Sequence, residues 1–274
     1  MNKKPLVSVV VTTKNEEHNI GNCLKSIKRQ TYPEIEIIVV DNNSTDRTKE
    51  IASEYTSQVY NYGDERSEQR NYGISQAQGQ YILYLDADMD LGMCVVEDCV
   101  SLARDDSSIS GIYIPEEIEG MGFWIDVRNF ERSFYTGTVI DCCRYFPLDI
   151  FLEIGGFDTS LTGVEDWDLD KYIRSCGNTK IIKSSLYHNE GNFDIDKYLR
   201  KKSYYIPSIK IYQDKWGKWD KDIRKQTGLW YRFFGVYFED WKFLKLIRHP
   251  LLTGGMYYLR LRVGMLYFRK SKII

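Results

Sequence analysis

Several features that would assign a function directly are missing from this sequence. The six cysteines form no Cys-x-x-Cys pair and have no histidine at zinc-ligand spacing, so neither a disulfide framework nor a zinc site is indicated. No window is apolar and long enough for a membrane span, and the N-terminus leads into a short strand pattern instead of a signal region. We therefore expect a cytoplasmic chain that neither crosses a membrane nor is secreted.

Two phosphate-binding motifs are also missing. No Gly-x-Gly-x-x-Gly follows the first expected strand, and no Gly-x-x-x-x-Gly-Lys-Ser/Thr occurs in the chain. Both motifs hold phosphates on glycine-rich backbone turns, so the dinucleotide-binding and P-loop interpretations lose their support. Any nucleotide would be bound by other groups.

The composition is that of an ordinary soluble protein, but its charge is unevenly distributed. The 274 residues are 43% hydrophobic and 28% charged, which allows a full core. Residues 1–196 carry a net charge of −16, whereas residues 197–274 carry +14 and hold 18 of the 39 aromatic residues. Such a basic, aromatic segment can bind nucleic acid or an anionic membrane, or it can dock on the acidic part of its own chain.

Strand and helix patterns alternate over the first two thirds of the chain. Strands are expected at 7–13, 36–41, 58–62, 81–85, 109–114, 138–146 and 179–186, and helices at 20–28, 44–54, 67–77, 94–104 and 120–135. This alternation predicts an α/β fold with a mostly parallel central sheet and right-handed connections.

Acidic residues follow two of these strands. Asp41 closes the second strand, and Asp86 and Asp88 follow the apolar run that begins at Tyr81. Ligands of open α/β sheets gather beyond the carboxyl ends of strands, and carboxylates suit Mg²⁺ or Mn²⁺. The alternative is an acidic turn on a solvated surface.

Two further positions have a functional and a structural interpretation. Glu165 and Asp166 stand at an expected helix N-terminus, where carboxylates serve catalysis or simply cap the helix. His188 is expected at the end of the strand 179–186, where it is either a structural histidine or a metal ligand.

Taken together, these motifs resemble family-2 glycosyltransferases with the GT-A fold. The matching segments, in the family's order over about residues 5 to 190, are 8–16 (SVVVTTKNE), 39–46 (VVDNNSTD), Arg70-Asn71 with Gly73 and Gly79, Asp86-Ala87-Asp88, Gly155-Gly156-Phe157-Asp158 and 165–169 (EDWDL). The resemblance implies that a sugar is transferred from a nucleotide diphosphate donor to an acceptor hydroxyl with inversion at the anomeric carbon.

The resemblance also assigns the donor site. It implies that Thr12, Glu16 and Asp41, with Asn42, hold the base and ribose, and that Arg70 approaches the diphosphate. Lys14 stands where many relatives have an aromatic residue, and the pair 42–43 (Asn-Asn) replaces a frequent Asp-Gly pair. The identity of the base therefore stays open.

The catalytic and metal-binding roles follow in the same way. The resemblance implies that Asp88 ligates Mg²⁺ or Mn²⁺, that Asp86 contacts the ribose or a metal-bound water, and that His188 is a weaker candidate ligand. Asp166 is implied as the general base that takes the proton of the acceptor hydroxyl, with Glu165 as the alternative.

The expected organisation is a GT-A catalytic domain over 1–196, with a donor half at about 1–115 and an acceptor half at about 116–196, followed by a basic, amphipathic helical region over 197–274. That region would attach the protein to the inner face of the cytoplasmic membrane and favour a glycan or lipid-linked acceptor, or it would pack on the catalytic domain or a partner subunit.

Two other functions remain open: a catalytically idle GT-A-like scaffold or carbohydrate-binding module, and a nucleotidyltransferase. No nucleic-acid-binding module is visible, and the acidic first part would repel phosphates.

Overall fold

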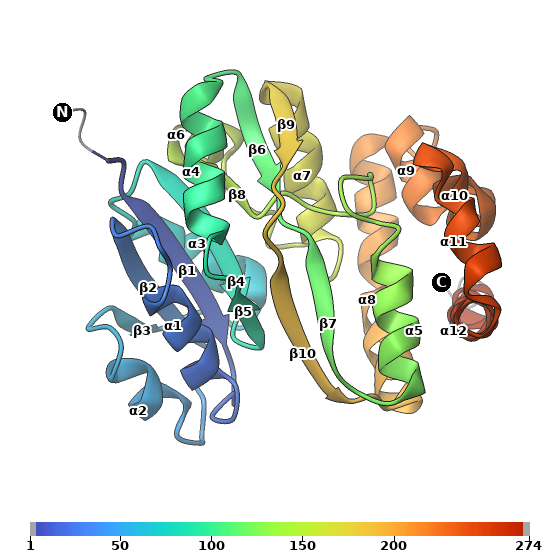
Figure 1. The fold of residues 1–274 in the computed structure, drawn as a ribbon, viewed down its shortest axis with the longest axis horizontal. Helices are drawn as coiled ribbons and strands as arrows, with labels where there is room; N and C mark the ends of the chain where they lie inside the picture. Colours follow the sequence, from blue (N-terminus) through green and yellow to red (C-terminus); the bar gives the residue numbers. More distant parts are fainter. Residues whose placement is uncertain (1–3, 271–274) are drawn as a thin grey trace. The chain divides into compact units, whose positions relative to one another are not determined.

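The computed structural model describes residues 4–270 (Figure 1). Contacts divide the chain into two units. The first unit runs to Glu116 and also contains Cys142–Asn189, and the second contains Glu117–Asp141 and the residues from Glu190 onward. The chain thus passes from the first unit to the second and back before its C-terminal helices begin. The sequence-based division at residue 196 did not group 117–141 with those helices.

The first unit is built on a seven-stranded sheet of order β3-β2-β1-β4-β8-β6-β9. Its strands are β1 (Val7–Thr13), β2 (Ile35–Asp41), β3 (Val59–Asn61), β4 (Tyr81–Asp86), β6 (Ile109–Tyr113), β8 (Tyr145–Pro147) and β9 (Asn178–Ile181). Only β8 runs antiparallel to its neighbours β4 and β6. The predicted mostly parallel α/β sheet is therefore confirmed.

Helices cover both faces of this sheet (Figure 1). They are α1 (Ile20–Lys28), α2 (Thr48–Ser53), α3 (Arg66–Ser75), α4 (Val95–Asp105), α6 (Leu148–Ile154) and α7 (Glu165–Cys176). Side chains of β1 alternate between the faces: Val9 lies in the core that includes residues of α1 and α4, and Val10 in the core that includes residues of α3 and α7. Burial on both faces explains why β1 is an unbroken apolar run.

Gly73 allows α3 to lie directly on the sheet. A Cβ at this position would stand 2.5 Å from Cγ1 of Val10 and 2.9 Å from Cγ2 of Val40. Only glycine permits this approach, which fixes the height at which α3 presents its polar residues at the sheet edge.

The predicted strand over 138–146 is wrong, since only Tyr145–Pro147 is extended and paired. The amides of Thr138 and Asp141 instead donate to the carbonyls of Tyr135 and Thr138 in turns. The Asp141 carboxylate also accepts hydrogen bonds from Arg132, at 2.8 Å, and from the Gly137 amide, at 3.0 Å. These local bonds outweigh the β-branched composition that suggested a strand.

The predicted strand over 179–186 is confirmed only at its start, because β9 ends at Ile181 and a new strand, β10 (Leu186–Asn192), follows. The Ser184 hydroxyl donates to Asp98 at 2.6 Å, and the Ser185 carbonyl accepts from the Gly92 amide at 3.0 Å. These bonds take the chain out of the first sheet. His188 consequently lies inside β10 and not at the end of a strand.

A second sheet has the order β5-β10-β7, with β5 (Met89–Leu91) and β7 (Glu116–Met121). His188 pairs with Met89 in the antiparallel β10–β5 ladder. The predicted helix over 120–135 therefore begins later, as α5 (Phe123–Arg132), because 116–121 form β7 and glycines with positive φ at 120 and 122 separate the two elements.

The second unit is mainly helical, as expected for the C-terminal region. Besides α5 it contains α8 (Ile195–Trp216), α9 (Lys221–Thr227), a π-helical turn (Tyr231–Gly235), α10 (Val236–Phe238), a 3-10 turn (Glu239–Trp241), α11 (Phe243–Arg248) and α12 (Pro250–Lys270). Its core includes Phe134, Tyr212, Tyr237 and Met256, all nearly inaccessible to solvent. Within residues 4–270, no helix combines the length and apolar character needed to cross a bilayer.

Candidate active site

The site begins where β1, β2 and β4 end side by side. Thr12 pairs with Asp86 and Thr13 with Asp41 in the parallel ladders, so the strand ends deliver these residues to one sheet edge. The Thr12 hydroxyl donates to Oδ1 of Asp86 at 3.1 Å. The expected gathering of polar residues beyond the carboxyl ends of the strands is therefore present.

Arg70 links this edge to α7. Its guanidinium is completely buried and donates to Oδ1 of Asp86 at 2.8 Å and to Oδ1 of Asp166 at 2.9 Å. It also lies 4.7 Å from the ring centroid of Tyr84 and 5.2 Å from that of Phe157. One arginine thus fixes two carboxylates that are 80 positions apart in the sequence.

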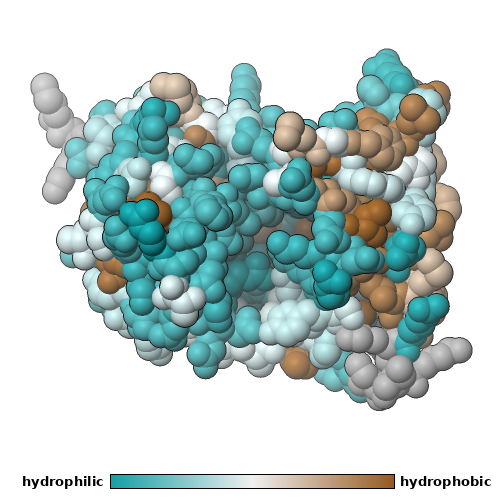
Figure 2. All heavy atoms as spheres, turned by 90° about the horizontal axis from the view of Figure 1, so that it is seen from below, coloured by the Kyte–Doolittle hydropathy of each residue, from teal (hydrophilic) through white to brown (hydrophobic). Residues whose placement is uncertain are grey.

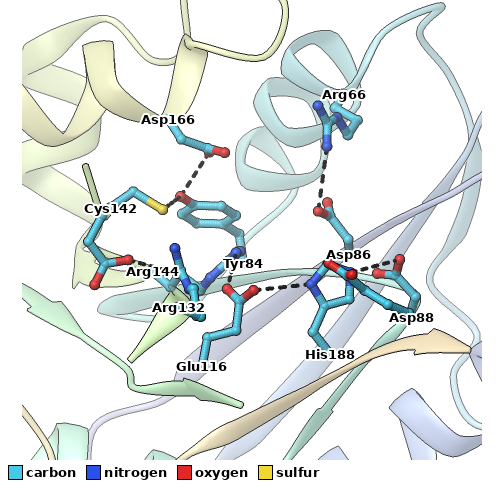
Figure 3. Close-up of polar contacts among 12 residues, drawn as sticks. Arg66, Tyr84, Asp86, Asp88, Glu116, Arg132, Cys142, Arg144, Asp166 and His188 are labelled. Carbon is cyan, nitrogen blue, oxygen red and sulfur yellow. Dashed lines mark hydrogen bonds and ion pairs between the residues drawn. The ribbon is translucent and has the colours of Figure 1, made fainter. Parts of the chain in front are cut away.

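Asp86 is held as an anion. Burial would raise the pKa of its carboxyl, but Arg70, Arg66 and Arg144 hold that pKa well below its usual range. Arg66 lies one helical turn before Arg70 on α3, with its guanidinium 3.7 Å from Oδ2 of Asp86 (Figure 3). The side chain of Arg66 is 30% exposed, so it can reach a ligand that Arg70 cannot.

Asp166 and Glu165 begin α7 but differ in access. The Tyr84 hydroxyl donates to Oδ1 of Asp166 at 3.0 Å (Figure 3). Arg70 donates to the same oxygen, and Oδ2 accepts nothing from the described part of the chain. The Asp166 side chain is 27% exposed, whereas that of Glu165 is 1% exposed. Burial and the neighbouring Asp166 raise the pKa of Glu165. Asp166 therefore offers the oxygen that an external hydroxyl could reach.

Asp88, His188 and Glu116 form a second chain of contacts, visible in Figure 3. Nε2 of His188 lies 3.2 Å from Oδ2 of Asp88, and Nδ1 lies 3.1 Å from Oε1 of Glu116. Burial alone would lower the pKa of His188, but these two hydrogen bonds raise it to about 10. Both ring nitrogens are engaged, so His188 would have to give up a carboxylate partner in order to ligate a metal.

The residues fit a divalent cation at Asp88. Oδ1 of Asp88 is buried and has no hydrogen-bond partner, although a buried carboxylate oxygen normally has one. Among residues 4–270, no group of three or more His, Cys, Asp or Glu side chains could enclose a metal ion. The set present is thus one open carboxylate oxygen, which matches Mg²⁺ or Mn²⁺ completed by substrate phosphates and water.

The residues that are expected to hold the base and ribose lie at the end of β2 and in the loop after β1. Oδ2 of Asp41 accepts from the Ser44 amide at 2.7 Å, and its Oδ1 is buried without a partner. Asn42 donates to the carbonyl of Asp64 at 2.7 Å, and Glu16 accepts from Asn19 at 2.6 Å. Asp41 thus keeps one acceptor oxygen for a ligand donor.

The structure brings five of the predicted site residues into one network, namely Thr12, Arg70, Asp86, Glu165 and Asp166, and it joins Asp88 to His188. Asp41, Asn42 and Glu16 bond instead to the Ser44 amide, the Asp64 carbonyl and Asn19. Sequence reasoning missed Arg66, Tyr84, Glu116 and Arg144. The spacing of Arg66 and Arg70, four residues apart on a helix, could have revealed Arg66. Nothing in the sequence marks Glu116, because its contacts with His188 and with Arg144, at 3.4 Å, arise only from folding.

Comparison with known sequences identifies the family to which the chain is similar. The sequence model described as glycosyl transferase family 2 matches residues 8–150, which is more than half of the chain. Glycosyltransferase AglE of Haloferax volcanii is 41% identical over 93 residues, covering 31% of each chain. Glycosyltransferase GlyA of Streptococcus pneumoniae is 27% identical over 223 residues, which are 76% of this chain and 29% of GlyA. The chain thus spans about a third of the length of these relatives.

Solved structures share the fold. Mannosyltransferase PcManGT from Pyrobaculum calidifontis, in complex with GDP-Man and Mn²⁺, superposes with a TM-score of 0.61 at 18% identity, covering 99% of this chain and 81% of that one. S. aureus TarS 1–349 in complex with UDP-GlcNAc gives a TM-score of 0.56 at 17% identity, covering 97% and 92%. At these identities the likeness establishes the architecture alone.

Proposed function

Because the chain belongs to glycosyltransferase family 2, we propose that it is an inverting glycosyltransferase that moves a sugar from a nucleotide diphosphate donor to an acceptor hydroxyl in glycan biosynthesis. One observation carries this proposal. Asp41, Asp88 and Asp166 each keep one carboxylate oxygen without a partner among the described residues, whereas their other oxygens are fixed by the protein. These three oxygens provide an acceptor for the nucleoside, a ligand for a cation and a base for the acceptor hydroxyl.

Separate residues would hold the nucleoside and the phosphates of the donor. Asp41, with Asn42, Thr12 and Glu16, would hold the base and ribose, as the family resemblance implies. Arg70 is completely enclosed, so we propose that it positions Asp86 and Asp166, and that the partly exposed Arg66 is the arginine that approaches the donor phosphates.

A divalent cation would be held by Asp88, with Asp86 nearby in the same turn; when bound, it would neutralise negative charge on the leaving nucleoside diphosphate. PcManGT, which shares the fold, was solved with Mn²⁺ and a nucleotide sugar. His188 and Glu116 would orient the Asp88 carboxylate through its Oδ2 and leave Oδ1 for the ion.

On the acceptor side, Asp166 would take the hydroxyl proton as the hydroxyl attacks the anomeric carbon. Arg70 and Tyr84 hold its Oδ1, which fixes the direction of Oδ2. An oriented carboxylate within hydrogen-bond reach of the nucleophile is what an inverting displacement requires. The burial of Glu165 makes it the less accessible alternative.

We also propose that the acceptor is membrane-proximal and that the C-terminal helices bind an anionic bilayer. Apolar side chains that are more than half exposed recur along this region. They include Trp230, Phe234, Phe238, Trp241, Ile247, Leu251, Leu261 and Phe268. Figure 2 shows hydrophobic patches interspersed with hydrophilic residues on the face that it displays. Aromatic and aliphatic residues interleaved with lysine and arginine suit the headgroup region of a membrane.

Thermal unfolding with a panel of nucleoside diphosphates and nucleotide sugars, with and without Mn²⁺, tests the enzyme proposal. At a ligand concentration of 100 times Kd, binding to the folded state stabilises it by about 2.7 kcal/mol, so at least one nucleotide should raise Tm in a Mn²⁺-dependent way. Asp88→Ala should abolish the Mn²⁺-dependent part of the shift. If no nucleotide raised Tm, or if Asp88→Ala responded like the wild type, this assignment would be rejected.

A further inference from the structure

The second unit contains a cluster of cationic side chains that the proposed reaction does not use. We call it the cation cluster: Arg128 on α5, Lys202 on α8, Arg232 in the π-helical turn and Arg260 on α12. These residues are far apart in the sequence, and they are brought together by the packing of the second unit's helices. Within the described residues, the carboxylates that pair with them are Glu131 and Glu190 alone.

Two members of the cation cluster use up both carboxylates. Arg128 donates to Oε2 of Glu131 at 2.7 Å and to Oε1 of Glu190 at 3.0 Å. Oε1 of Glu131 accepts from Nε of Arg260 at 3.1 Å and from the Tyr135 hydroxyl at 2.8 Å. No described carboxylate is paired with Arg232 or Lys202. With Lys202 protonated, the cluster therefore holds four cations against two anions.

Donors in the cation cluster are also left without acceptors. Nη1 of Arg232 and Nη1 of Arg260 are both buried and have no hydrogen-bond partner. The two guanidinium groups lie 5.4 Å and 5.6 Å from the centroid of the Tyr135 ring, whose hydroxyl accepts from Nη2 of Arg260 and leaves both Nη1 atoms unpaired. Buried guanidinium nitrogens normally have partners, so an acceptor that completes them is expected to come from a ligand.

Lys202 reflects the same deficit of negative charge. Its ammonium lies 5.4 Å from the ring centroid of Tyr198, a ring that Arg128 also approaches at 5.0 Å. Burial, Arg128, Arg232 and Lys201 lower the pKa of Lys202 to about 7, and Glu131 opposes this only in part. An anion at this place would relieve the repulsion among the cations.

We propose that the cation cluster is a binding site for a phosphoryl group, with Arg232 and Lys202 as its principal donors and Arg260 beside them. A phosphate dianion balances the two excess positive charges and offers several acceptor oxygens to the unpaired guanidinium nitrogens and the ammonium group. Arg232 and Lys202 are only half-buried, which leaves a route for a ligand. The phosphoryl group would belong to a phosphorylated acceptor or to free inorganic phosphate.

Calorimetric titration of the full chain with inorganic pyrophosphate, near pH 8, without divalent metal and at constant ionic strength, tests the proposal. The wild type should bind, and Arg232→Gln and Lys202→Met should each weaken binding at least about tenfold. Lys201→Met removes the same charge from the neighbouring, exposed position on α8 and should change affinity less than about twofold. Absence of wild-type binding, or an equal loss in Lys201→Met, would overturn the site.

Two further readouts separate this site from a structural role and from the site on Asp88. Binding should be accompanied by proton uptake on Lys202, seen as a dependence of the measured heat on the buffer's ionisation enthalpy, and this dependence should vanish in Lys202→Met. Lys202→Met removes a cation from an over-charged cluster, so the variant should fold. If pyrophosphate binding were instead lost in Asp88→Ala and kept in both cluster variants, the phosphoryl site would lie in the first unit and the proposal would fail.

The source of the phosphoryl group is decided by two more ligands. Lys202→Met should weaken binding of glycerol 3-phosphate if the site takes a phosphorylated acceptor, and binding of inorganic phosphate alone if it takes the free anion. Either result supports a phosphoryl site, and unchanged binding of both ligands counts against it. Failure of the glycosyltransferase assignment would leave the pyrophosphate result standing, so the two proposals fail separately.

Discussion

At the scale of single residues, Asp166 shows how a carboxylate can be both fixed and available. Its Oδ1 is bound by Arg70 and Tyr84, and its Oδ2 has no partner among the described residues. Asp166→Asn keeps the size and shape of the side chain but removes the carboxylate that would accept the proton. We expect donor binding to persist and kcat for transfer to fall by about 10²–10⁴-fold. Steady-state kinetics combined with donor titration measure both quantities.

The contrast with Glu165 provides the control for this experiment. Glu165→Gln alters a side chain that is 1% exposed, so it should reduce kcat less than Asp166→Asn does. Transfer by Asp166→Asn at the wild-type rate would exclude Asp166 as the base, and a larger loss in Glu165→Gln would assign the role to Glu165.

Arg70 is the residue on which the site's stability depends most. Its completely buried guanidinium separates Asp86 from Asp166, and replacing it would leave buried negative charges without compensation. Arg70→Met should lower the free energy of unfolding by about 3–5 kcal/mol, as for other broken buried ion pairs. Urea unfolding measures this change.

Arg47→Met is a matched control for Arg70→Met. Arg47 pairs with Glu50 at 2.8 Å, but both side chains are more than half exposed. Loss of this surface pair should cost about 1 kcal/mol or less. Equal destabilisation by the two variants would show that burial of Arg70 does not govern its contribution.

At the scale of elements, α3 and α7 do most to build the site. Gly73 seats α3 on β1 and β2, and the preceding turns of the same helix carry Arg66 and Arg70 toward the sheet edge. α7 begins with Glu165 and Asp166, so its first turn meets α3 through Arg70. The strands supply the acids at their ends, and the two helices supply the cations and the base.

In the second unit, Glu131 ties α5 to α12 and makes stability dependent on pH. Burial would raise the pKa of its carboxyl, but Arg260, Arg128 and the Tyr135 hydroxyl lower it from 4.5 to about 2. Because the folded-state pKa is the lower one, the stabilisation is fully present above about pH 4.5 and is lost as the pH falls toward 2.

We therefore expect Glu131→Gln to be less stable than the wild type near neutral pH and the difference to shrink as the pH falls through this window. Denaturant unfolding followed by circular dichroism, at neutral pH and at about pH 3, measures both free energies. Glu119→Gln, at an exposed position of β7, should keep the wild-type pH dependence. A pH-independent difference for Glu131→Gln would contradict the assignment.

At the scale of the whole molecule, charge and apolar surface are separated along the chain. Residues 1–196 carry −16 and residues 197–274 carry +14. The acidic part includes the carboxylates that the proposed cation and donor need. The basic part combines cations with exposed aromatic residues, a composition that suits an anionic surface.

Membrane attachment is tested by co-sedimentation of the full chain with vesicles at low salt. We expect binding to vesicles rich in anionic lipid, little binding to zwitterionic vesicles, and weaker binding as salt rises. The double variant Trp230→Ser, Ile247→Ser removes two side chains that are at least 70% exposed and should reduce binding. Leu152→Ser, 65% exposed in the first unit, should not. No binding to anionic vesicles by the wild type would refute membrane attachment.

Much of the first unit could be predicted because its elements are encoded locally. β1, β2 and β4 are continuous apolar runs, and polar residues at their ends mark the sheet edge. The errors fall where tertiary contacts prevail over local pattern. Asp141 binds Arg132 and turns the chain where a strand was expected, and Ser184 and Ser185 bind Asp98 and Gly92 between β9 and β10.

The sequence by itself determined the α/β fold, the acids at the ends of β2 and β4 and the carboxylates at the start of α7, because periodicity and the order of motifs depend only on neighbouring residues. Only the tertiary structure decided that Arg70 is enclosed between Asp86 and Asp166, that His188 lies between Asp88 and Glu116, and that four cations meet around two carboxylates in the second unit. Except for the pair of Arg128 and Glu131 on α5, those contacts join residues from different segments of the chain. The strength of each contact depends on burial and on the charged partner, and both exist only once the chain is folded.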